Sequence, residues 1–90
     1  MKLSNHARKR LQQRGIPRDA VDLLAAYGAV DHQRGAEYFF FDKSSRRWLI
    51  RDLGREALRG MEKVLNAYMV VSEGRVIATV GYRYQRVIRH

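Results

Sequence analysis

The sequence predicts an α+β domain in which two N-terminal helices pack on a small antiparallel sheet, with a third helix in the middle of the chain. Three observations predict this fold: helical periodicity with capping residues in the first third, a short aromatic run near the centre, and two runs of branched and aromatic residues near the C-terminus. The chain has 90 residues, the size of one domain, so we expect residues 1–90 to form a single unit.

The first third of the chain carries the start and stop signals of a helix pair. Ser4 is a good N-cap for a helix that runs through Gln13, and Gly15 is its stop. Pro17 then opens a second helix over about residues 18–27, because proline is favoured in the first turn. The apolar face of this second helix consists of Ala20, Val21, Leu23 and Leu24.

The middle of the chain predicts a strand followed by a helix. Residues 38–41 are short and aromatic, which is typical of a strand buried on both faces. Residues 44–59 repeat apolar side chains at helical spacing, with Ser44 or Ser45 as the cap, although residues 48–50 alone could form a strand. Gly54 makes a break in that helix possible.

The last third predicts a β-hairpin. Val64–Val71 and Arg75–Tyr82 are rich in strand-forming residues, and Glu73-Gly74 supplies a residue that tolerates the positive φ of a tight turn. Residues 84–89 form either one more short strand or a tail. The predicted element order is therefore α-α-β-α-β-β, with the helices packed on the sheet.

A two-residue loop at Glu73-Gly74 would fix which residues lie on each face of the hairpin. It pairs Val71 with Val76, Tyr68 with Thr79, Asn66 with Gly81, and Val64 with Arg83. The helix-facing side would carry Leu65, Ala67, Met69, Val71, Val76, Ala78, Val80 and Tyr82. The other side would gather Asn66, Tyr68, Thr79 and Arg83, with Val70 and Ile77 near the turn. Gly81 would leave room there for a ligand. An ordinary half-exposed sheet is also polar on one face.

Net charge favours a polyanionic partner. Eighteen Lys and Arg against nine Asp and Glu give a formal charge of +9, and Arg far outnumbers Lys. The guanidinium fork matches phosphate oxygens in pairs, so the bias towards Arg favours nucleic acid, and RNA above all, over a generically charged surface.

A basic stripe is predicted on the first helix. His6, Arg10 and Arg14 recur every four residues, and the apolar stripe of Leu3, Ala7 and Leu11 runs beside them. The basic groups should therefore lie at the rim where the helix meets the sheet. An ordinary solvated face is the alternative, but the stripe contains like charges at repelling spacing, and residues 3–18 include no acidic residue.

The sequence lacks the residues that metal, cofactor and glycine-rich phosphate sites require. The chain has no cysteine, only three histidines, no acidic cluster, and no glycine-rich phosphate-binding motif, so we expect no metal and no cofactor. The absence of disulfides, of a signal peptide and of a membrane-spanning apolar run favours the cytoplasm and excludes a membrane partner. Phosphate chemistry without a metal remains.

The stretch 4–17, SNHARKRLQQRGIP, followed by Val21, resembles the signature S-x-H-A-x-x-R-x-x-x-R-G-I-x-x-x-x-V of a family of small bacterial toxin-like domains of unknown function. Residues 76–83, VIATVGYR, are similar to the closing strand of that family, although Ala78 precedes Thr79 where the family commonly has Ile-Thr-Val. The family is grouped with the barnase, EndoU, colicin and RelE-like ribonucleases, which act on RNA without metal. The resemblance implies a cleft that joins His6, Arg10 and Arg14 to Thr79 and Arg83. It also implies an antitoxin protein, or a phage or plasmid setting.

These observations lead to two hypotheses of different classes. The first is a metal-independent endoribonuclease that activates the RNA 2′-hydroxyl, with His6 as acid or base and Thr79 or Tyr68 as the positioning hydroxyl. Its phosphate contacts would come from Arg10, Arg14, Arg83 and, for RNA binding, Arg86. The rival is a noncatalytic nucleic-acid-binding or regulatory module that uses the same basic face; a structural phage or plasmid protein is a third possibility.

Overall fold

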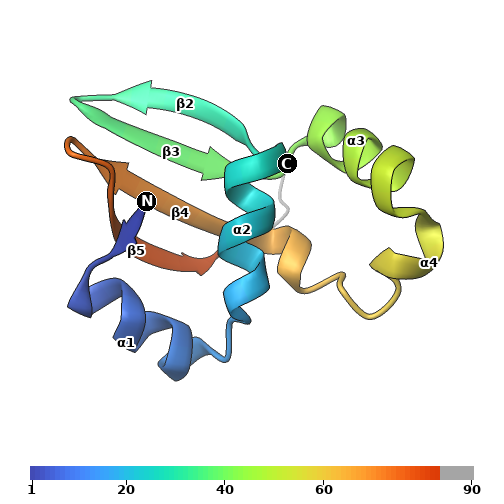
Figure 1. Cartoon of the computed structure of the whole chain (residues 1–90), viewed down its shortest axis with the longest axis horizontal. Helices are drawn as coiled ribbons and strands as arrows, with labels where there is room; N and C mark the ends of the chain where they lie inside the picture. The colour runs from blue at the N-terminus through green and yellow to red at the C-terminus, as the bar shows by residue number, and fades with distance from the viewer. Residues whose placement is uncertain (84–90) are drawn as a thin grey trace, which may run out of the picture.

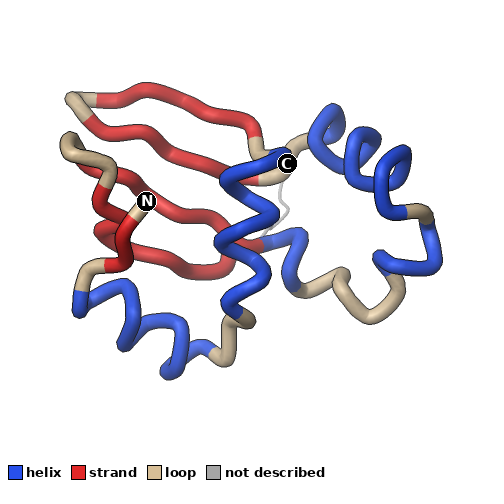
Figure 2. Tube along the Cα trace, viewed as in Figure 1, coloured by secondary structure: helices blue, strands red, loops and turns tan. Residues whose placement is uncertain are grey.

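The computed structural model describes residues 1–83 and shows the α+β fold that the sequence predicts. The helices are α1 (Asn5–Arg14), α2 (Arg18–Tyr27), α3 (Lys43–Leu53) and α4 (Arg55–Leu58), with a 3₁₀ turn over Val64–Asn66. The strands are β1 (Lys2–Leu3), β2 (Ala29–Gln33), β3 (Ala36–Phe40), β4 (Ala67–Ser72) and β5 (Val76–Tyr82). They form one sheet in the order β1-β5-β4-β3-β2. α2 crosses the sheet and α3 and α4 lie beyond one end of it (Figure 1, Figure 2).

Helix α1 begins after the predicted N-cap, Ser4, and ends at Arg14, one residue later than predicted. The Ser4 hydroxyl accepts a hydrogen bond from the Ala7 amide at 3.0 Å, and it donates one to the Ala78 carbonyl at 3.2 Å. Gly15 ends the helix in the left-handed conformation, with φ +63°. One side chain therefore caps the helix and ties its first turn to β5.

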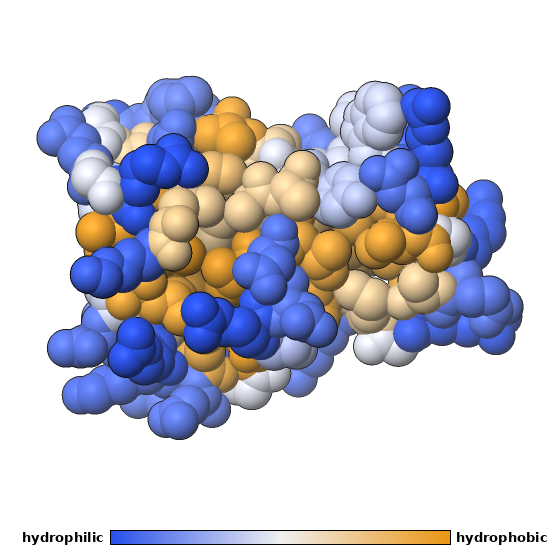
Figure 3. Space-filling view, viewed as in Figure 1, coloured by the Kyte–Doolittle hydropathy of each residue, from blue (hydrophilic) through white to orange (hydrophobic). Residues whose placement is uncertain are grey.

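The core lies between the sheet and the first two helices. α1 packs along β5, and α2 packs on β4 and β3. The largest fully buried side chains are Leu24, Leu49, Met69, Ile77, Val71 and Val80. In the view from the helix side, hydrophilic residues edge the molecule and apolar residues gather along its middle (Figure 3). The helix pair thus covers one face of the sheet, as expected.

Two strands were missed by the sequence analysis. β1 has only two residues and pairs in parallel with β5, so the sheet is mixed and not purely antiparallel. β2 pairs with β3 through a turn at Arg34 and Gly35, both at positive φ. The sequence of β2, AVDHQ, is mostly polar and exposed because it forms the edge of the sheet, and so it lacks the alternation of a half-buried strand.

The long helix predicted for residues 44–59 is two helices. Gly54, at φ +85°, separates α3 from α4, at the position where a break was expected. Asp42, and not Ser44 or Ser45, is the N-cap of α3: its carboxylate accepts hydrogen bonds from the amide and the hydroxyl of Ser45. These bonds stabilise the charged form and lower the pKa of Asp42. Residues 64–66, predicted as strand, form the 3₁₀ turn.

The predicted register of the last hairpin is wrong. The loop has three residues, because Ser72 pairs with Val76 and the loop includes Arg75, which adopts φ +60° although it is not glycine. An irregularity opposite Val70 and Val71 then shifts the pairing by one more residue. The observed partners are Val71 with Ile77, Val70 with Thr79, Met69 with Val80, Tyr68 with Gly81, and Ala67 with Tyr82. The shift moves Ile77 to the helix-covered face, where it is buried.

The double role of Ser4 predicts the effect of Ser4→Ala. Loss of the cap and of the bond to Ala78 should lower the free energy of unfolding by about 1 kcal/mol. Urea denaturation followed by far-UV circular dichroism measures this loss. Ser44→Ala is the matched control, since Ser44 is exposed in the first turn of α3, and it should leave the denaturation midpoint nearly unchanged. Equal midpoints for the two variants would contradict the role assigned to Ser4.

Candidate nucleic-acid interface

Within residues 1–83, α1 and α2 cover one face of the sheet, and we call the face turned away from them the open face. Phe39, Met69 and Val80 stand beside one another in β3, β4 and β5 and are buried under the helices. Side chains alternate along a strand, so the residues between them point the other way. The open face carries Tyr38 and Phe40 of β3, Tyr68 and Val70 of β4, and Thr79 of β5, all half-buried.

An aromatic cluster occupies the centre of the open face. The ring centroid of Tyr38 lies 5.7 Å from that of Phe40 and 5.4 Å from that of Tyr68, and both ring pairs are tilted. The Arg83 guanidinium carbon lies 4.7 Å from the centroid of Phe40, which is within cation–π range. We call these four residues the aromatic face. It combines apolar rings with a guanidinium group at one site.

Gly81 does not leave room for a ligand, contrary to the sequence prediction. A Cβ at this position would lie 2.9 to 3.1 Å from two ring carbons and the hydroxyl oxygen of Tyr68. The ring of Tyr68 therefore lies over Gly81 on the neighbouring strand and fills the space. Glycine accommodates the ring here, because any side chain would have to displace it.

The predicted catalytic residues come from two parts of the fold. His6, Arg10 and Arg14 belong to α1, which packs on the helix-covered face. Thr79 and Tyr68 belong to the open face, and the contact of Arg83 with Phe40 places it there too. The cleft that the resemblance implies between the two sets stays a prediction, because α1 begins beside β5, where the Ser4 hydroxyl donates to the Ala78 carbonyl. Arg86 and the strand or tail predicted for residues 84–89 lie outside the described residues.

The basic stripe on α1 is only partly at the rim of the sheet. His6 and Arg14 are exposed, whereas Arg10 is half-buried. The Nε of Arg10 is enclosed and has no hydrogen-bond partner among residues 1–83. The half-burial of Arg10 agrees with the expected rim position. The other two side chains behave as a solvated basic face.

The part of the chain that the structure describes offers neither a cluster of metal ligands nor a membrane-spanning helix. No group of three or more His, Cys, Asp or Glu side chains lies close enough to hold a metal ion there. His32 contacts Glu37 at 3.1 Å across the β2–β3 hairpin, and alternation along β3 turns this pair to the face opposite Tyr38. No helix in this part is long and apolar enough to cross a bilayer.

Comparison with known proteins adds no relatives to this description. No protein-family model, no curated protein and no solved structure matches the chain. The resemblance to toxin-like ribonucleases therefore depends on the sequence motifs alone, and the function must be argued from the geometry.

Sequence reasoning missed two members of the aromatic face. The run of residues 38–41 was interpreted as a strand buried on both sides, but Phe39 and Phe41 are buried while Tyr38 and Phe40 alternate with them on the open side. The tyrosine hydroxyl was the available signal, since a phenol is seldom left in an apolar core without a partner. Tyr68 and Arg83 were placed on the correct face.

The close packing of Tyr68 on Gly81 predicts the effect of Gly81→Ala. The added methyl group must displace the Tyr68 ring, because the alternative is a contact below 3 Å. We expect loss of the nuclear Overhauser contacts between the Tyr38 and Tyr68 rings, with a folded chain. Ala78→Gly is a control on the same strand, because it adds no atom that could contact Tyr68. Unchanged ring contacts in Gly81→Ala would contradict the described packing.

Proposed function

We propose that this domain binds single-stranded RNA on the open face of its sheet, without cutting it. The observation that carries the proposal is the aromatic face, in which three rings from two adjacent strands lie next to the Arg83 guanidinium. Splayed bases stack on aromatic side chains and on guanidinium planes, and sheet faces of this composition suit that mode of recognition.

Charge supports the same partner. A chain with a formal charge of +9 attracts a phosphate backbone at long range. Stacking of a base on an aromatic side chain contributes about 1–3 kcal/mol by alanine substitution, so two or three rings suffice for a short segment of strand. Thr79, beside Val70 on the same face, adds a hydroxyl that can donate to or accept from a base or a 2′-hydroxyl.

The endoribonuclease hypothesis receives less support from the geometry. It requires His6 and a phosphate clamp in one groove, whereas His6 belongs to α1 and the Thr79 and Arg83 side chains belong to the open face. Among residues 1–83, the strand pairing places no histidine on the open face. That face carries rings, hydroxyls, a guanidinium and, opposite Tyr38, the exposed carboxylate of Asp31. Without a histidine beside them, these groups hold a strand more readily than they move protons near neutral pH.

The proposal predicts which substitutions weaken RNA binding. Tyr68→Ala should weaken the affinity for a labelled single-stranded RNA of about 12 nucleotides by about 5-fold or more, and Tyr68→Phe should retain it, since the ring does the stacking. Arg83→Ala should also weaken binding. Fluorescence anisotropy at several salt concentrations measures these affinities, and the logarithm of the affinity should fall linearly with that of the salt concentration.

His6→Ala is the matched control for this series, because His6 is exposed on α1 and outside the aromatic face. It should bind RNA like the parent. A large loss with His6→Ala and none with Tyr68→Ala would reverse the assignment of the face.

Cleavage is predicted to be absent. Incubation of the protein with total RNA in EDTA should leave the length distribution of the RNA unchanged, with or without ribosomes. Shortened RNA from the parent, intact RNA from His6→Ala and normal binding by both would restore the endoribonuclease hypothesis.

A further inference from the structure

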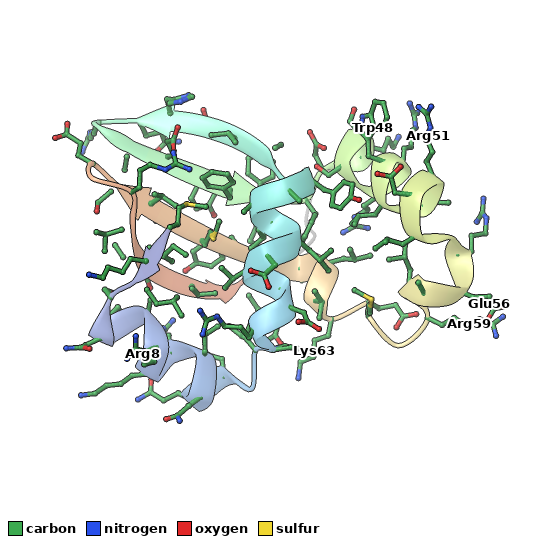
Figure 4. The ribbon with its side chains drawn as sticks, in the orientation of Figure 1. Arg8, Trp48, Arg51, Glu56, Arg59 and Lys63 are labelled. Carbon is green, nitrogen blue, oxygen red and sulfur yellow. The ribbon has the colours of Figure 1, made fainter. Side chains whose placement is uncertain are left out.

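A second aromatic and basic site lies on α3, outside the aromatic face. Trp48 is the only tryptophan of the chain and is 51% exposed. It lines a surface pocket of about 260 Å³ together with Ser44, Arg47 and Arg51. Trp48 and Arg51 point in the same direction, away from the body of the molecule (Figure 4). The Arg51 guanidinium carbon lies 5.0 Å from the indole ring centre.

Helix geometry groups these four side chains. Positions 44, 47, 48 and 51 follow the i, i+3, i+4, i+7 spacing of one helix face. The buried residues of α3, Ser45 and Leu49, lie on a different side of the helix. The pocket is therefore a property of a single rigid element, and its lining does not depend on the packing of a loop.

Basic side chains repel one another along α3. Lys43 and Arg47, like Arg47 and Arg51, are like charges four residues apart, a spacing at which they repel. Asp42, the N-cap, is the negative group at the start of the helix, and the first turn itself contains no acidic residue. A bound anion beside Arg47 and Arg51 would reduce the repulsion between them.

The position of α3 is fixed by contacts on its other sides. Leu49 is fully buried, and Asp42 and Ser45 form the capping box at the start of the helix. Tyr27 of α2 donates a hydrogen bond to Asp52 at 2.9 Å, and this bond raises the pKa of Tyr27. The acidic group nearest to Arg51 in sequence is thus directed towards α2. The indole is presented on a positioned helix, which lowers the entropic cost of stacking on it.

We propose that this pocket binds one nucleotide of a single strand, with the base stacked on Trp48 and the phosphate held by Arg47 and Arg51. The inference rests on the proposed function for the identity of the strand as RNA. It adds a second contact with that strand, outside the open face. Three peptide units join Phe40 to Lys43 at the start of α3, and Trp48 lies five helical residues further on. The Cα atoms of Phe40 and Trp48 are therefore at most about 19 Å apart. At a stacked rise of ~3.4 Å, roughly six nucleotides span that distance.

The experiment uses Trp48 as its own reporter, because the chain contains no other tryptophan. The full chain is titrated with an oligouridylate of about 12 nucleotides, while Trp48 emission and the anisotropy of a label on the RNA are followed together. Stacking should quench Trp48 in step with binding. Trp48→Ala should weaken the affinity by about 5-fold or more, and Arg51→Ala and Arg47→Ala should weaken both signals.

Arg46→Ala is the control for general charge, because Arg46 is exposed on the same helix but does not line the pocket. It should cost less affinity than Arg51→Ala. Far-UV circular dichroism and the denaturation midpoint confirm that each variant is folded, and Trp48→Phe, which keeps a ring, should retain most of the affinity.

The outcomes separate this inference from the proposed function. Normal RNA binding with unchanged Trp48 emission and an unaffected Trp48→Ala variant would overturn the α3 site and leave the sheet face standing. Quenching that depends on Arg51 and persists in Tyr68→Ala with undiminished affinity would support the α3 site and overturn the sheet face. A blue shift of Trp48 with anionic phospholipid vesicles, with no response to RNA, would overturn the nucleotide site in favour of a lipid surface.

Discussion

The alternation of side chains along β3, β4 and β5 is the constraint on which the rest of the structure depends. Burial of Phe39, Met69 and Val80 beneath α1 and α2 turns their neighbours to the other side of the sheet. The aromatic face is therefore produced by the same pairing that forms the core. A one-residue slip of β4 would bury Tyr68 under the helices and expose Met69. The free energy lost in this way would exceed the small net stability of a domain of this size.

Local signals in the sequence were sufficient for much of the fold. Ser4, Gly15 and Pro17 mark the first two helices through capping and backbone geometry, which act over a few residues and can be read without the sheet. Gly54 marked the break between α3 and α4 for the same reason. The two edge strands could not be found in this way, because β2 is polar at the margin of the sheet and β1 exists only through its pairing with β5.

The site was less predictable because it depends on which face each helix covers. Alternation placed Tyr68, Thr79 and Arg83 on one side correctly, although the loop length and the pairing were wrong. The positive φ of Arg75 and the irregularity beside Val71 have no clear residue signature, so the register could not be derived. A basic stripe on α1 likewise does not reveal how it lies relative to Thr79, because that relation is set by the packing of α1 on β5.

Charge and aromatic surface therefore have different roles in this molecule. The basic residues of α1 lie outside the aromatic face, and a screening length of about 10 Å at 0.1 M salt weakens their effect on a strand held there. They contribute to the overall potential that draws a polyanion towards the protein, an effect on the association rate. Arg83 differs because it lies over Phe40, where a stacked base would meet it directly. The position of a bound strand is accordingly decided by the rings and by the few guanidinium groups that contact them, while the excess of positive charge decides how often a strand arrives.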